Sequence, residues 1–60
     1  MTTGEMLAYT DRFKEILNGT KELKVTRLKS LSDDLIAYCD LENDAFAKQL
    51  FCTVVEEMHA

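Results

Sequence analysis

The sequence contains no proline, no tryptophan and only two glycines among its 60 residues. Proline and glycine are the residues that most often interrupt a helix, and the valines and isoleucines that favour strands are also few. The chain is nevertheless 47% hydrophobic and 30% charged, a balance typical of a folded protein rather than a disordered one. We therefore predict an all-α fold, with a single helical domain over residues 1–60.

Long hydrophobic runs are absent as well. No stretch approaches the roughly 18 apolar residues that a membrane-spanning helix requires, and the start M-T-T-G-E has neither the basic nor the apolar region of a secretory signal. The two cysteines are then expected to stay reduced. We predict a cytoplasmic protein with no membrane partner.

Histidine is scarce, since the only one is His59, near the C-terminus where helices fray. No glycine-rich phosphate loop, nucleophile elbow or His-Glu-x-x-His motif is present. We also expect a chain this short to have little room for a concave pocket of several hundred Å³. These absences predict a protein that is not an enzyme and holds no cofactor.

Two stretches have a weak likeness to metal sites. D-L-E-N-D, from Asp40, places carboxylates at alternate positions as a calcium loop does, but Ala45 and Phe51 stand where the loop requires glycine and glutamate. Cys52, Glu56 and His59 can share one helix side, yet they lack the spacing of a zinc site. We predict no bound metal.

The hydrophobic pattern predicts helical segments at both ends of the chain. The first runs from about Thr3 to Leu17, with a capping box formed by Thr2 and Glu5 and a core stripe of Met6, Tyr9, Phe13, Ile16 and Leu17. Gly19 is expected to end it and Thr20 to cap the next helix. The last runs from about Asp44 to His59, capped by Asn43 or Asp40, and is expected to supply most of the core.

The middle segment, Thr20 to Leu41, leaves two interpretations open. Leu28, Leu31, Leu35 and Tyr38 keep helical spacing, with Ile36 and Cys39 beside them, which favours one continuous helix. Ser32 followed by Asp33 and Asp34 is instead typical of a helix start, and the cations before it and acids after it oppose a single helix dipole. These features favour a break near Ser30–Ser32, and we interpret Lys24–Leu35 mainly as a junction.

Size and charge guide the functional hypotheses. A 60-residue chain buries only about 60% of its unfolded surface, so we expect a bundle of three helices completed by dimerisation. We predict a small regulatory or adaptor protein that binds another protein through helix faces, as a homodimer. The candidate contact residues lie on the last segment: Phe46, Leu50, Phe51, Val54, Val55 and Met58.

The alternative hypothesis is a nucleic-acid-associated regulator that uses a basic patch of Lys21, Lys24, Arg27 and Lys29. These cations spread around the helix and have no aromatic or amide side chains between them, and the whole chain carries a net charge of −4. Nucleic acid is therefore the less favoured partner. Cys52 lies among polar residues and is a candidate reactive thiol.

Overall fold

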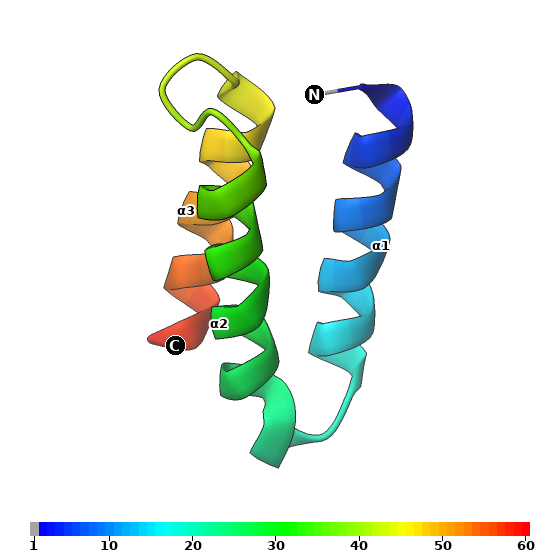
Figure 1. Ribbon diagram of the computed structural model, residues 1–60. Helices are drawn as coiled ribbons and strands as arrows, with labels where there is room; N and C mark the ends of the chain where they lie inside the picture. Colours follow the sequence, from blue (N-terminus) through cyan, green and yellow to red (C-terminus); the bar gives the residue numbers. More distant parts are fainter. Residues whose placement is uncertain (1) are drawn as a thin grey trace.

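The computed structural model describes residues 2–60, which form three helices joined by short turns (Figure 1). The helices are α1 (Thr3–Asn18), α2 (Lys21–Tyr38) and α3 (Ala45–Met58), and each runs antiparallel to the one before it. The predicted all-α fold of three helices is confirmed, and residues 2–60 contain no strand. None of these helices combines the length and the hydropathy needed to cross a bilayer.

The start of α1 follows its local sequence signals. Thr2 Oγ1 accepts a hydrogen bond from the Glu5 amide at 3.2 Å, and the Glu5 carboxylate accepts one from the Thr2 amide at 3.3 Å, which confirms the capping box. Gly19 ends α1 as predicted, its amide donating to the Ile16 carbonyl at 3.2 Å. Thr20 stands at the N-cap of α2, but its side chain makes no capping hydrogen bond.

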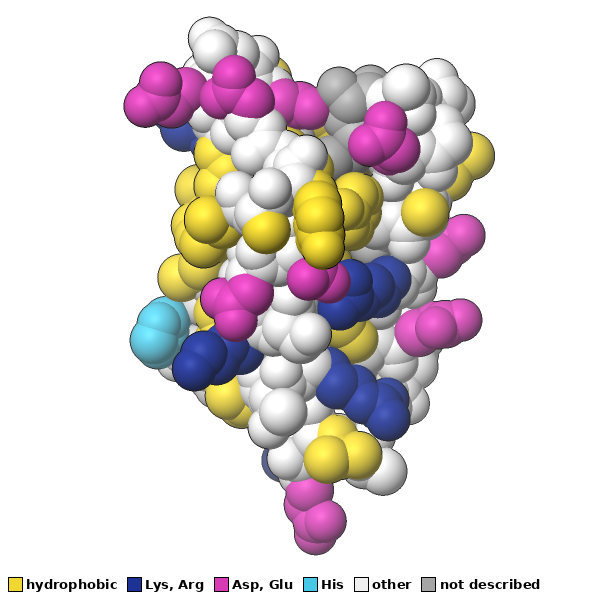
Figure 2. Space-filling view, in the orientation of Figure 1, with side chains coloured by type: hydrophobic (Ala, Val, Ile, Leu, Met, Phe, Trp, Pro, Cys, Tyr) yellow, Lys and Arg dark blue, Asp and Glu magenta, His cyan; other side chains and the backbone are white. Residues whose placement is uncertain are grey.

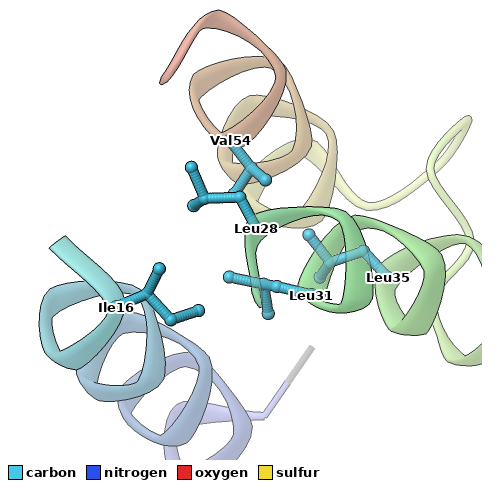
Figure 3. Packing of buried hydrophobic residues seen from close by; sticks show 5 residues of the cluster. All are labelled: Ile16, Leu28, Leu31, Leu35 and Val54. Carbon is cyan, nitrogen blue, oxygen red and sulfur yellow. The ribbon is translucent and has the colours of Figure 1, made fainter. Parts of the chain in front are cut away.

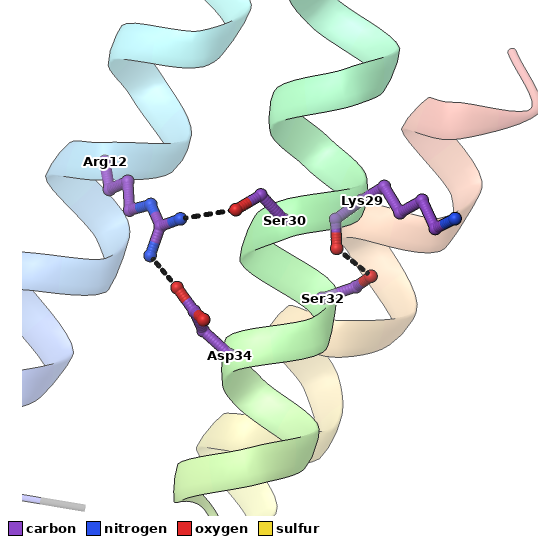
Figure 4. A network of polar contacts seen from close by, with 5 residues as sticks. All are labelled: Arg12, Lys29, Ser30, Ser32 and Asp34. Carbon is purple, nitrogen blue, oxygen red and sulfur yellow. Dashed lines mark hydrogen bonds and ion pairs between the residues drawn. The ribbon is translucent and has the colours of Figure 1, made fainter.

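α2 is one unbroken helix, so of the two interpretations the continuous helix is confirmed, and the alternative break near Ser30–Ser32 and the junction at Lys24–Leu35 are wrong. Ser32 is buried inside the helix, where its Oγ donates to the Lys29 carbonyl at 2.8 Å (Figure 4). Asp34 accepts from Arg12 of α1 at 2.5 Å, and Arg12 also donates to Ser30 Oγ at 3.4 Å. The polar residues that resembled a helix start therefore lie within α2, where Ser32 bonds the backbone of the helix and Asp34 bonds α1.

The core is built around α2, which packs closely against α3 and less extensively against α1. Leu28, Leu31 and Leu35 are fully buried and meet Ile16 from α1 and Val54 from α3 (Figure 3). The expectation that the last helix supplies most of the core is therefore wrong, because the middle helix is covered from two sides.

The predicted stripe of α2 stops short of its C-terminus. Tyr38 is 78% exposed, because α2 ends there and the chain turns away at Cys39. Cys39 is half-buried and packs against the core, as predicted, whereas Ile36 is 58% exposed.

The turn between α2 and α3 is organised by two aspartates. Asp44 caps α3, accepting from the Ala47 amide at 3.1 Å, so the predicted caps Asn43 and Asp40 are wrong. Asp40 Oδ2 accepts from the Asn43 side chain at 2.8 Å, and its Oδ1 accepts from the Glu42 and Asn43 amides. These bonds, the one from the Asn43 side chain first among them, hold the pKa of Asp40 below its ordinary value.

Leu31→Ala is expected to cost about 2–5 kcal/mol, because it empties a fully enclosed site between α1 and α2. In a domain this small that loss would leave much of the protein unfolded. Leu23→Ala is the matched control, since Leu23 lies in the same helix but is 47% exposed, and it should change stability by less than about 0.5 kcal/mol. Urea denaturation followed by circular dichroism measures both; equal effects would contradict the core described above.

Candidate interaction surfaces

α1 and α3 barely contact each other, and a groove remains between them. Its volume is about 290 Å³, and the side chains that line it are uncharged: Thr10, Phe46, Gln49, Leu50 and Thr53. We call it the α1–α3 groove. Phe46 and Leu50, both predicted contact residues, are only partly covered there.

A second hollow, of about 630 Å³, lies between the start of α1 and the turn from α2 to α3. This hollow is larger than expected, because so short a chain was expected to have little room for a concavity of several hundred Å³. Acidic and hydrophobic side chains mix along its wall, among them Glu5, Met6, Tyr38, Asp40 and Phe46. Phe46 is shared with the α1–α3 groove, so the two concavities adjoin. His59 follows the far end of α3, at the opposite end of the bundle.

Tyr9 marks the contact between α1 and the end of α2. Burial raises the pKa of its phenol, and the neighbouring thiol of Cys39 raises that pKa further. The folded chain therefore stabilises the neutral phenol of Tyr9, in keeping with its place against the core.

The six contact residues predicted on α3 do not form one surface. Val54 is fully enclosed and belongs to the core, out of reach of a partner, and Met58 packs partly buried against that core. Phe46 and Leu50 face the α1–α3 groove. At 100° per residue Phe51 and Val55 fall on the other flank of the buried Val54, away from α1.

A second hydrophobic surface forms where this flank of α3 adjoins α2. Val25 and Ile36 are 54% and 58% exposed and lie about 20° apart around α2, on the side opposite Asp34, which faces α1. Together with Phe51 and Val55 they form what we call the outer α2–α3 face. Hydrophobic side chains are visible along this flank in Figure 2.

The candidate contact residues predicted from the sequence did not include Val25 and Ile36. The available signal was their position off the buried stripe: Val25 was out of phase with Leu28 and Leu35, and Ile36 was at the stripe's edge. Large hydrophobic residues in such positions are left exposed when the helix is continuous.

The predicted basic patch is not gathered on one side of α2. Lys24 is partly covered and lies near α3, with its Nζ 3.4 Å from Glu57 Oε2. Lys29 extends toward α3, away from Arg12 (Figure 4), whereas Lys21 and Arg27 are exposed. The hypothesis of nucleic-acid contact stays a prediction that this arrangement does not strengthen.

The two cysteines are free and differ in exposure. Cys52 lies exposed on α3, and Cys39 is half-buried at the end of α2. Among residues 2–60, no three His, Cys, Asp or Glu side chains are grouped so that they could hold a metal ion.

No protein-family model matches the chain, and comparison with curated proteins and with solved structures found no similar sequence or fold. The surfaces themselves are therefore the basis for proposing a function.

Cys52 is expected to react with a thiol reagent such as iodoacetamide at least about tenfold faster than Cys39, because only Cys52 is exposed in the folded chain. Mass spectrometry of the folded protein over time measures the two rates. In urea the rates should converge, which provides the control. Faster labelling of Cys39 under folding conditions would contradict the packing of α2 against α1.

A gel-shift titration with duplex DNA is expected to show no binding at low salt, because the cations are dispersed and Lys24 is paired with Glu57. Contact by all four cations of the predicted patch would instead give a log–log salt slope of about −3.6 per chain. A slope of that size, lost on replacing Lys21 and Arg27 with Gln, would favour the nucleic-acid hypothesis.

Proposed function

We propose that the protein is a non-catalytic regulator or adaptor that acts by binding another protein through its helix faces, as a homodimer. One observation carries the proposal: two separate hydrophobic surfaces lie on opposite flanks of α3, the α1–α3 groove and the outer α2–α3 face. Among residues 2–60 no further helix or strand covers either one. Two surfaces suit two contacts, one with a second copy and one with a target.

The thin core supports association. Among residues 2–60 only six hydrophobic side chains are buried: Ile16, Leu28, Leu31, Leu35, Ala47 and Val54. The accessible surface is 4308 Å², above the roughly 4,000 Å² expected for a folded monomer of 6.9 kDa. Both cysteines are free, which fits the reducing cytoplasm and leaves no disulfide to add stability. Burial against a second chain is the remaining source of stabilisation.

The proposed lack of catalysis is supported by the distribution of the reactive side chains. The carboxylates around the larger hollow lie at one end of the bundle, and His59 lies at the other. General acid–base chemistry requires such groups within about 3 Å of a shared substrate atom. Binding remains the activity that the surfaces support.

A photoreactive benzoylphenylalanine at position 36 is expected to capture one discrete protein in the cells that make this chain, because Ile36 lies on the outer α2–α3 face. The same residue at position 26 is the control, since Thr26 is exposed on the same helix about 80° further round. Gel electrophoresis and mass spectrometry identify the adducts. No adduct from position 36, or the same adducts from both positions, would contradict target binding through this face.

A further inference from the structure

We propose that the α1–α3 groove is the dimer interface and that the two copies lie antiparallel, with the two-fold axis near the middle of α1 and α3. This inference deepens the proposed function and depends on its homodimer. The lining of the groove, the size of the molecule and the distribution of charge along the bundle support it.

The groove can be buried without removing a charge from water. Its five lining side chains are hydrophobic or neutral, and Thr53 already donates its hydroxyl to the Gln49 carbonyl at 3.0 Å. Desolvating an unpaired charge is the main cost that a protein interface must avoid. The groove is also the seam where the bundle is least closed, since α1 and α3 barely contact each other.

The small size of the molecule carries the interface beyond the groove itself. A stable dimer covers roughly 800 Å² of each partner, about a fifth of the 4308 Å² accessible surface of this chain. A contact of that area exceeds the five side chains that line the groove, so on a Cα framework 32 by 21 Å it reaches toward both ends of the bundle. The charged residues at both ends of the bundle then lie near the second copy.

Charge is distributed unequally along the bundle. Cutting each helix at its midpoint gives one half, next to the turn between α2 and α3, with six acids and one cation, and another half with five acids and six cations. Their net charges of about −5 and +1 add to the −4 of the chain. In Figure 2 a row of acidic side chains lies along the top of the view, whereas below it acidic side chains are mixed with most of the visible Lys and Arg side chains.

This distribution selects the orientation of the second copy. A parallel dimer would place two strongly acidic ends side by side, whereas an antiparallel dimer places each acidic end beside the weakly basic end of the other copy. Like charges brought together across an interface are unfavourable, and their arrangement fixes orientation more than affinity. The antiparallel arrangement is isologous, as most homodimers are.

The side chains on α3 fit the same arrangement. Phe46 and Thr53 are seven residues apart, about two helical turns, and lie on the same flank with Leu50 between them. When two such helices lie antiparallel about a point between Gln49 and Leu50, each Phe46 comes level with the small Thr53 of the other copy. A parallel arrangement would set Phe46 against Phe46. Large side chains opposite small ones pack without voids.

Sedimentation equilibrium of the full chain and two variants tests the interface. Thr53→Arg is expected to raise the dimer dissociation constant at least about tenfold, because it places a bulky cation in the α1–α3 groove. Thr26→Arg adds the same charge on the exposed side of α2 and should change the constant by less than about twofold. Circular dichroism and thermal unfolding confirm that both variants keep the fold.

Spin labels on α1 test the orientation in the intact dimer. Single cysteines at positions 6, 10 and 17, all on the groove side of α1, are labelled in a dimeric Cys39→Ala, Cys52→Ala background. In an antiparallel dimer the axial separation between the two labels is near zero at position 10, about 13 Å at position 6 and about 20 Å at position 17. Pulsed electron paramagnetic resonance measures these distances.

The possible outcomes separate this inference from the proposed function. A wild-type chain that stays monomeric at high micromolar concentration would overturn both the inference and the proposed homodimer. A dimer that tolerates Thr53→Arg, or one whose label distances are equal at the three positions, would overturn the groove or the orientation while leaving the homodimer in place. Weakened association together with the graded distances supports the inference.

Discussion

The fold depends on one hydrophobic stripe, formed by Leu28, Leu31 and Leu35 on α2. α1 covers it from one side through Ile16, and α3 covers it from the other through Val54. Because these leucines span two turns in the middle of α2, the helix must stay continuous between Lys24 and Leu35 for both neighbours to pack. The polar residues in that stretch form hydrogen bonds that are compatible with a continuous helix. Ser32 donates to the Lys29 carbonyl of the same helix, and Asp34 accepts from Arg12 of α1.

The features that could be predicted from the sequence are those formed between residues close together in the chain. The Thr2–Glu5 capping box involves residues three positions apart, so its outcome did not depend on the rest of the chain. Ser32 and Asp34 also carried a local helix-start signal, but the burial of Leu31 and the guanidinium of Arg12 decided their roles, and neither is visible in a window of ten residues. The share of the core that α3 supplies was predicted to be too large, also because the packing of the whole chain decides it. The hydrophobicity of one helix does not reveal which helix stands in the middle.

The candidate surfaces were partly predictable. Phe46 and Leu50 lie on the groove side of α3. This was expected, because α3 carries more hydrophobic side chains than two short neighbouring helices can cover. Val54 was indistinguishable from them by spacing, because burial depends on which flank of α3 meets α2. The exposure of Val25 and Ile36 could be predicted only if α2 was known to be continuous. Their exposure follows from the continuity of α2, which the sequence left open.

Charge and hydrophobic burial have separate roles in this molecule. The Arg12–Asp34 and Lys24–Glu57 pairs are each about one-third exposed, so screening limits either to about 1 kcal/mol or less. The order of charges along the chain, cations before acids, becomes an end-to-end asymmetry because α2 runs back alongside α1. Such an asymmetry does little for the stability of a monomer, whereas it discriminates between orientations of a second copy. A core confined to one leucine stripe leaves hydrophobic side chains exposed on the bundle. In the proposed dimer those side chains would supply the contact, and the charges would fix the orientation of the second copy.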